Sequence, residues 1–205
     1  MQETIEMKKY ALVEAEFEIS SDKTCMIRAM LSLERLWTPF LYATRERTDI
    51  QEKIRIYMDG VWESIFDDNV ESFPKEYYEQ ILDEIDEEYC GDESNIVQEC
   101  YYDQYLINAL AAGFGWFFCE NRPKRPDIVM STTDLIHDKI VDDNNFVNEQ
   151  EKITYFSKNK YMLDELRRID EDYEIGVSWV QNKEKILQLK EKYQNMWIVP
   201  VGEKI

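Results

Sequence analysis

The most apolar stretch of the chain is YLINALAAGFGWFFC, residues 105–119. It holds no charged side chain, and it is long enough for about four turns of helix. A helix that is apolar on every side is typical of a buried position, and the small residues Ala111, Ala112, Gly113 and Gly115 would let neighbouring helices approach closely. The stretch therefore predicts a central helix inside a bundle, in which the polar Asn108 must find hydrogen-bond partners.

Apolar residues recur at spacings of three and four on both sides of this stretch. Before it, one helix is predicted by Met26, Met30, Leu33, Trp37 and Phe40, and a second by Ile50, Ile54, Tyr57, Val61 and Ile65. With only six glycines and few alternating β-branched residues, we expect an all-α fold. The prediction is one domain over residues 1–205, a bundle of about seven or eight helices around a buried apolar central helix. Residues 3–18 fit either a helix or a strand and are interpreted as a helix.

Helix boundaries in the C-terminal half are predicted from capping residues and breakers. Ser131, Thr132 and Asp134 resemble a capping box that opens a short helix ending near Ile140. A longer helix is expected from 146 to 172, and Gly176 is expected to break the chain before a last helix. The apolar tail at 197–201 should dock on the bundle.

Negative charge is concentrated between residues 62 and 105. This segment carries fifteen Asp and Glu residues and one Lys, so it holds −14 of the net charge of −19. Tyr78, Ile81, Leu82, Ile85 and Tyr89 recur at helical spacing, which places the acids on a folded helix. Like charges four residues apart on that helix cost up to ~0.5 kcal/mol per pair. Such repulsion favours a binding face, although a solvated face that only aids solubility is the alternative.

An acidic face centred on 62–105 would attract a basic protein partner, with tyrosines as contact anchors. The predicted partner-binding residues are carboxylates and tyrosines of this segment: Glu76, Tyr77, Glu79, Asp83, Glu84, Asp86, Glu87, Glu88, Tyr89, Asp92, Glu93, Tyr101 and Tyr102.

The composition argues against other classes of partner. The negative balance disfavours direct binding to nucleic acid, whose backbone recruits Lys and Arg. The N-terminus lacks a secretory pattern and no apolar run reaches the ~20 residues of a membrane span, so we expect a cytoplasmic protein without membrane contact. Cys25, Cys90, Cys100 and Cys119 show no CxxC spacing and are interpreted as buried thiols.

The residues do not predict catalysis, a cofactor or a metal site. His137 is the only histidine, and its pairing with Asp134 three residues earlier lacks the second such pair that helical di-metal sites use. We interpret His137 as a helix-surface residue. The stretch from Asp83 to Asp92 lacks the pattern of a calcium loop, and Gly113-Phe114-Gly115 lies in an apolar helix rather than after a strand. An enzyme with a carboxylate metal site remains as a minor alternative.

The order of these parts resembles a known family. Val61-Trp62-Glu63 on a helix, an acidic stretch, a small-residue-rich helix around Ala109 to Gly115 and a late charged helix are similar to the YjaG-like family of uncharacterised helical bacterial proteins. The resemblance covers about half the chain, and it implies a helical fold and no established activity. In composition the chain also resembles acidic bacterial toxin-immunity proteins.

These features together predict an acidic binding protein that neutralises a basic partner. The partner class that fits best is a toxin domain such as a nuclease, blocked by occlusion. The alternative from another class is a structural or regulatory helical domain that acts by homo-oligomerisation, with an acidic face for solubility.

Overall fold

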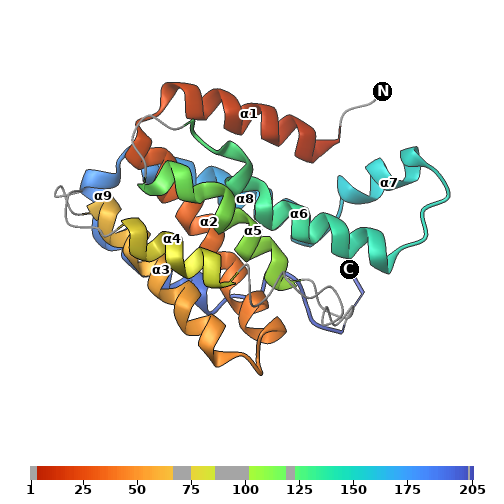
Figure 1. Ribbon diagram of the computed structural model, residues 1–205. Coiled ribbons are helices and arrows are strands. Elements are labelled where there is room, and N and C mark those ends of the chain that lie inside the picture. The colour runs from red at the N-terminus through yellow and green to blue at the C-terminus, as the bar shows by residue number, and fades with distance from the viewer. Residues whose placement is uncertain (1–3, 67–74, 86–101, 119–122, 203) are drawn as a thin grey trace.

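The structure is a computed structural model that describes residues 4–66, 75–85, 102–118, 123–202 and 204–205, apart from the side chain of Asp103. Within these residues it contains nine helices and no strand, so the predicted all-α class is confirmed. The helices are α1 (Ile5–Ile19), α2 (Asp22–Ala43), α3 (Thr48–Phe66), α4 (Lys75–Ile85), α5 (Tyr102–Phe118), α6 (Pro126–Asp143), α7 (Glu149–Phe156), α8 (Lys160–Val177) and α9 (Trp179–Gln194) (Figure 1).

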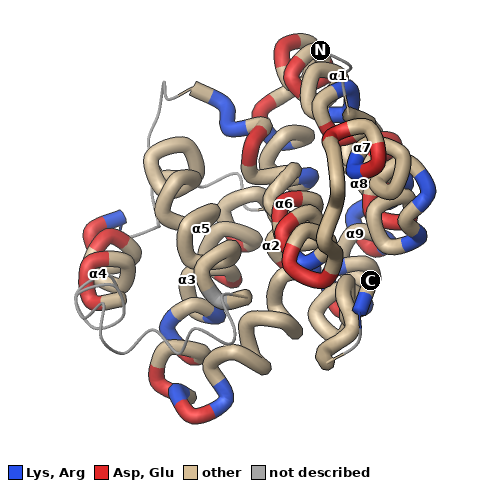
Figure 2. The backbone as a smooth tube through the Cα atoms, turned by 90° about the vertical axis from the view of Figure 1, so that its right-hand side faces the viewer, with Lys and Arg blue, Asp and Glu red and all other residues tan. Residues whose placement is uncertain are grey.

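The centre of the bundle is α2, which packs against α3, α5, α6, α8 and α9. Figure 2 shows α4 on one side of the molecule and α8 and α9 on the other, with α2 between them. The apolar stretch at 105–119 is therefore not the central helix: its part in α5 packs on α2 and α6 but leaves Asn108 and Ala111 exposed. The prediction was wrong on this point because α2, although more polar, finds partners for its polar side chains inside the protein.

One buried ionic group, here named the Arg35 cluster, joins four helices. It consists of Arg35 with Glu165, Asp172, Thr132 and Tyr193. The guanidinium of Arg35, fully buried, donates to Glu165 Oε1 at 2.7 Å and to Asp172 Oδ2 at 2.5 Å. The hydroxyls of Thr132 and Tyr193 donate to the same two carboxylates at 2.7 Å and 3.1 Å. The cluster therefore fixes α6, α8 and α9 against α2.

A second ionic group connects α2 to α3 and α9. Glu34 is fully buried, and its carboxylate accepts hydrogen bonds from Arg55 at 2.9 Å and from the indole N–H of Trp62 at 2.7 Å. Arg55 also forms an ion pair with Asp59 at 2.8 Å. Lys190 of α9 forms a second ion pair with Asp59 at 2.7 Å. Buried charges need such partners, because an unpaired one is costly to desolvate.

The predicted start of α6 was wrong. The helix begins at Pro126, a residue suited to the first turn because it lacks a backbone N–H. Ser131 and Thr132 lie inside it, where the Ser131 hydroxyl donates to the carbonyl of Asp127 and the Thr132 hydroxyl to Glu165. Ser131 therefore makes a hydrogen bond within α6, and Thr132 makes one to α8; neither caps the start of a helix.

The region from 146 to 172, predicted as one helix, forms α7 and the first part of α8. The break falls at 157–159, where the Asn159 side chain caps α8 by accepting from the N–H groups of Tyr161 and Met162. Gly176 does not end α8, which continues to Val177. Its carbonyl accepts from the Thr24 hydroxyl at 3.2 Å, which joins α8 to α2.

The two ends of the chain follow the sequence predictions. The ambiguous N-terminal segment is the helix α1, with Val13 and Phe17 buried. Ile198 and Val199 of the tail are buried, and Trp197 packs edge-on against Tyr42 at 5.7 Å. Cys25 is buried, as predicted, whereas Cys90, Cys100 and Cys119 lie outside the described residues. None of the described helices has the length and apolar content that a membrane span requires.

Candidate functional site

The acidic helix α4 is attached to the bundle by a narrow apolar stripe. Tyr78, Ile81 and Ile85, spaced by three and four residues, are its buried side chains. They face α3 and α5, the two described helices on which α4 mainly packs. Because the stripe covers only one side, the opposite side of α4 is left to solvent.

Gly60 of α3 explains how closely α4 can dock. A Cβ atom at this position would lie 2.2 Å from the Tyr78 hydroxyl oxygen, which is closer than any van der Waals contact permits. The Tyr78 ring stacks on Phe118 of α5 with centroids 4.7 Å apart and meets Tyr57 of α3 edge-on at 5.9 Å. Tyr78 is therefore an internal anchor that sets the orientation of α4, and it is not available to a partner.

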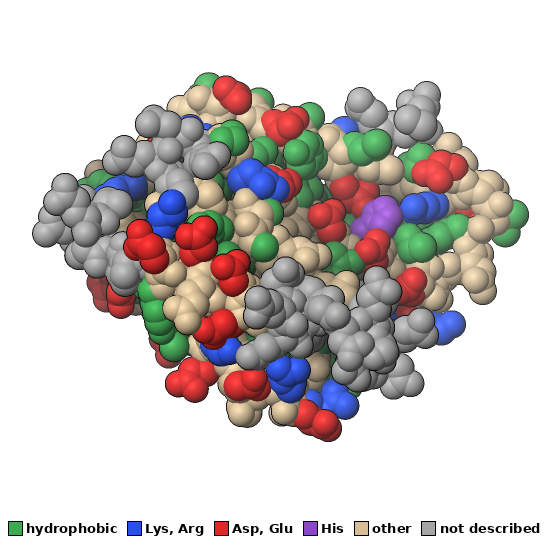
Figure 3. All heavy atoms as spheres, viewed as in Figure 1, with side chains coloured by type: hydrophobic (Ala, Val, Ile, Leu, Met, Phe, Trp, Pro, Cys, Tyr) green, Lys and Arg blue, Asp and Glu red, His purple; other side chains and the backbone are tan. Residues whose placement is uncertain are grey.

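The outward side of α4 carries four of the thirteen residues that the sequence predicted for binding. Glu76, Tyr77, Glu79 and Asp83 are all exposed, and 45% of the Tyr77 surface is open to solvent. We name these residues, together with the exposed Gln80, the acidic face of α4. No ion pair joins its three carboxylates to a cation within the part of the chain that the structure describes. Red side chains gather over α4 in Figure 3, and Figure 2 places this helix at one edge of the molecule.

Two predicted contact residues have internal roles instead. Glu84 pairs with Lys53 of α3 at 3.0 Å and accepts from Gln80 at 2.7 Å, and these bonds to the carboxylate lower its pKa. Tyr102 is 92% covered by the protein's own core, with 8% exposed. Tyr102 is therefore too covered to be a partner contact, and Glu84, although partly exposed, already has a cationic partner. Seven further predicted residues lie outside the described residues: Asp86, Glu87, Glu88, Tyr89, Asp92, Glu93 and Tyr101.

A second set of exposed carboxylates lies on α6, and the sequence reasoning missed it. Asp134, Asp138 and Asp142 are exposed and follow one another at four-residue intervals, so they share one side of the helix. Red side chains also gather along α6 on the face seen in Figure 3, beyond α5 from α4. The four-residue spacing of these carboxylates is the sequence signal of the stripe, and it is weaker than the charge density of residues 62–105.

A recess of about 420 Å³ lies between α5 and α6. Its lining includes Gln104, Tyr105 and Asn108 of α5 and Asp138 and Asp142 of α6. The Tyr105 hydroxyl donates to the Asp138 carboxylate, and burial together with that negative charge raises the pKa of Tyr105. Asn108 opens onto this recess, so the expectation that it would be buried and internally bonded was wrong.

Asp134 differs from the other α6 carboxylates in its electrostatic surroundings. Protein atoms around its carboxyl, together with the charges of Asp138, Glu6 and Asp127, raise its pKa to about 6, and His137 acts in the opposite direction. Crowded like charges favour the neutral acid. An arriving cation would relieve this crowding, so the α6 stripe is suited to binding positive groups.

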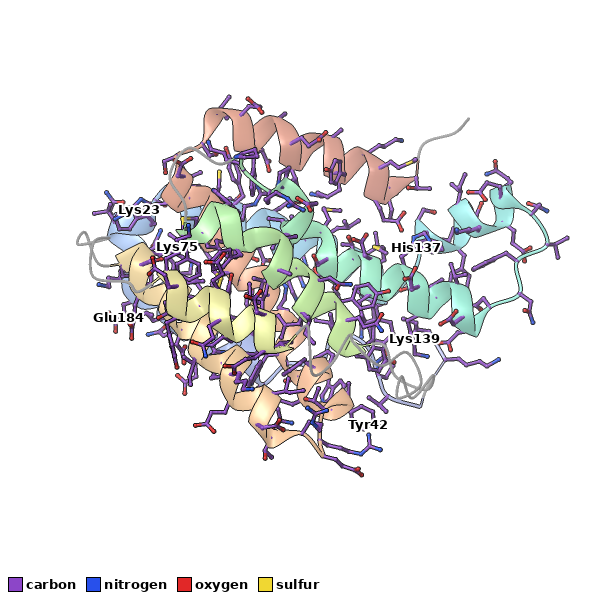
Figure 4. All side chains as sticks on the ribbon, viewed as in Figure 1. Lys23, Tyr42, Lys75, His137, Lys139 and Glu184 are labelled. Carbon is purple, nitrogen blue, oxygen red and sulfur yellow. The ribbon has the colours of Figure 1, made fainter. Side chains whose placement is uncertain are left out.

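His137 bridges two helices rather than standing on an open surface. Its Nδ1 lies 2.8 Å from Glu6 Oε1 of α1, and its ring packs against Phe156 of α7 with centroids 4.6 Å apart. This interaction with the histidine contributes to a lowered pKa for Glu6 despite partial burial. Figure 4 shows His137 on α6 facing the region of α7. Across the described ranges, no group of three or more His, Cys, Asp or Glu residues is arranged to hold a metal ion.

Comparison of the chain with models of protein families, with curated proteins and with solved structures found no match.

Proposed function

We propose that the protein binds and neutralises a basic protein partner through the acidic face of α4. The observation that carries the proposal is the contrast within one helix between anchored and unpaired groups. Tyr78 and Glu84 are committed to α3 and α5, whereas Glu76, Glu79 and Asp83 are exposed and without a cationic partner among the described residues.

Unpaired carboxylates on a rigidly docked helix suit recognition of cations. Because the close contact of Tyr78 with Gly60 sets the position of α4, the backbone that carries these carboxylates is placed before a partner arrives. Their summed field steers a positively charged protein and raises the association rate, most strongly at low ionic strength. The exposed Tyr77 ring, in the middle of these carboxylates, offers the amphipathic contact area that binding hot spots favour.

The α6 stripe extends the same chemistry across the molecule. Helix α6, which carries this stripe, packs on α5, and α5 packs on α4, so a partner of ordinary size could contact both sets. A basic surface large enough to span them is typical of proteins that hold nucleic acid. The partner class that fits best is therefore a nuclease-like toxin domain, and the mechanism would be occlusion of the lysines and arginines that hold the phosphate backbone.

In this proposal the protein acts in the cytoplasm as an immunity protein and performs no catalysis itself. To find a candidate partner, the genes next to this one would be searched for one that encodes a large secreted protein with a basic C-terminal domain. That domain would be expressed in an inactive form and its binding to the protein measured by calorimetry over a range of salt concentrations.

The decisive variant carries Glu76→Lys, Glu79→Lys and Asp83→Lys. We expect it to bind at least about tenfold more weakly than wild type, because each rim charge contributes up to ~1 kcal/mol and reversal also adds repulsion. The matched control carries Glu174→Lys, Glu184→Lys and Glu191→Lys, which changes the net charge equally on α8 and α9. The control should retain most of the affinity. Equal losses in the two variants would mean that only net charge matters, and wild-type affinity in the first would exclude α4 as the contact.

A further inference from the structure

A second concave site lies on another part of the molecule, where α7 meets the start of α8. It is a recess of about 690 Å³, and its lining includes Tyr155, Lys158, Asn159, Lys160 and Tyr161. This volume is within the range of pockets that hold small molecules. Figure 1 shows α7 at the edge of the molecule opposite α4, so the recess is separate from the acidic face of α4.

Asn159 places an unused hydrogen-bond donor in this recess. The residue is 9% exposed, and its Oδ1 accepts from the N–H groups of Tyr161 at 3.0 Å and Met162 at 3.2 Å. Because two backbone donors meet this atom, it must be the oxygen, and the orientation of the carboxamide is fixed. The remaining Nδ2 group makes no hydrogen bond to the described residues. The Nδ2 atom itself is reached by solvent, so it can donate to a ligand acceptor without giving up a bond within the described residues.

Two lysines line the same recess in an otherwise acidic protein. Lys158 and Lys160 are exposed, and no carboxylate among the described residues forms an ion pair with either. Lys160 is the first residue of α8, whose first turn contains no acid, so its charge adds to the positive end of the helix dipole. The carboxylate in the lining belongs to Glu151, which accepts from the Val147 N–H at 2.8 Å at the start of α7.

The walls of the recess are suited to an apolar group. The rings of Tyr155 and Tyr161 and the side chain of Ile205 line it. Tyr155 is held edge-on by Phe146, with centroids 5.5 Å apart. Aromatic walls of this kind favour a flat ring. The polar and the aromatic lining residues therefore suit different parts of one ligand, an anionic head group and an aromatic body.

We propose that this recess binds a small aromatic anion, with its carboxylate or phosphate on Asn159 Nδ2, Lys158 and Lys160 and its ring between Tyr155 and Tyr161. Anions are well accommodated at helix N-termini that offer such donors. The site goes beyond the proposed capture of a basic partner, since it takes a ligand of opposite charge at a different place.

Nuclear magnetic resonance titration of the full chain tests the proposal with four probes of similar size. Phenylacetate and phenyl phosphate carry the anion, 2-phenylethanol is neutral, and 2-phenylethylamine is cationic. We expect one or both anions to shift the side-chain amide signals of Asn159 and the backbone amides of 158–161, and the tighter of the two identifies the head group. The neutral and cationic probes should leave these signals in place. If they shifted the signals as strongly as the anions, or if no probe shifted them, the proposal would be wrong.

Two variants separate the anion site from helix stability. Asn159→Asp keeps an oxygen that caps α8 but replaces the donor with a negative group, and Lys158→Gln with Lys160→Gln removes the cations. Each should weaken anion binding about tenfold or more, as expected for the loss of hydrogen bonds to a charged group. Lys8→Gln with Lys185→Gln, which removes two exposed lysines elsewhere, is the control and should bind as wild type. Unchanged binding in the Lys158 and Lys160 double variant would overturn the proposal, whatever the folding of Asn159→Asp.

Discussion

Carboxylates on two sides of α2 differ in burial and in pairing. Glu165 and Asp172 of α8 are buried and share the guanidinium of Arg35, whereas Glu79 and Asp83 of α4 face water without a partner among the described residues. A buried carboxylate must be paired because its desolvation is costly, so it acts on the fold. An exposed carboxylate without a partner costs little free energy because water solvates it, so it stays available to another molecule. Charge alone therefore does not mark a binding face; burial and pairing decide it.

The largest expected effect on stability comes from disrupting the Arg35 cluster. Arg35→Met leaves Asp172 buried without a cation and Glu165 with Arg168 alone, at 3.2 Å, and should lower the free energy of unfolding by about 3–5 kcal/mol. Urea unfolding followed by circular dichroism measures this. Combining it with Glu165→Met and Asp172→Leu removes the stranded charges and should recover part of the loss. A loss below about 1 kcal/mol in the single variant would show that the Arg35 cluster is not a buried ionic group in solution.

The attachment of α4 provides the next test. Gly60→Ala places a methyl group within 2.2 Å of the Tyr78 hydroxyl oxygen, and overpacking of this kind costs about 1–3 kcal/mol. Hydrogen exchange should show faster opening of α4 than of α2 in this variant. In a Tyr78→Ala background the same substitution should cost much less, because the clashing ring is gone. An equal cost in both backgrounds would contradict the close contact.

The α6 stripe predicts a dependence of stability on pH. The folded pKa of Asp134, about 6, lies above the value of about 3.9 for an unfolded chain, so the folded protein binds the extra proton between these values. This carboxyl therefore lowers stability as pH rises from about 4 to 6, and the loss is fully present at pH 7. Asp134→Asn should match wild type near pH 4 and exceed it at pH 7 by about 1 kcal/mol or less, since solvent screens the exposed group. Thermal unfolding of both proteins over this range measures the difference, and a gap that widens toward acid would contradict the sign.

The smallest effect is expected on the exposed side of the comparison. Replacing Glu76 and Glu79 by Gln and Asp83 by Asn should change the free energy of unfolding by no more than about 0.5 kcal/mol, because surface charges without partners contribute little. A slight gain is expected from the removal of repulsion between Glu79 and Asp83. A loss above about 1 kcal/mol in chemical unfolding would mean that these carboxylates support the fold and are not reserved for a partner.

Local sequence patterns determined the helices of this protein. Apolar spacing of three and four predicted α2, α3, α4 and α9, because an amphipathic helix needs only neighbours along its own chain to define its buried side. The same pattern identified the outward placement of Glu79 and Asp83, since these residues lie opposite Tyr78 and Ile81 on the helix. The break near Asn159 escaped the prediction because it depends on a few local hydrogen bonds with weak sequence signals. The break before the last helix was predicted at Gly176 and lies at Ser178.

The tertiary structure alone decided which helix is central and which polar groups are free. Arg35 meets Glu165 and Asp172 across 130 and 137 residues, and no local pattern distinguishes these carboxylates from exposed ones. The same holds for Tyr102, which packs inward although it adjoins the acidic segment, and for the unused Nδ2 group of Asn159 at the recess. Burial and pairing are properties of contacts between distant segments, so they follow from how the helices pack and not from the periodicity of any one of them.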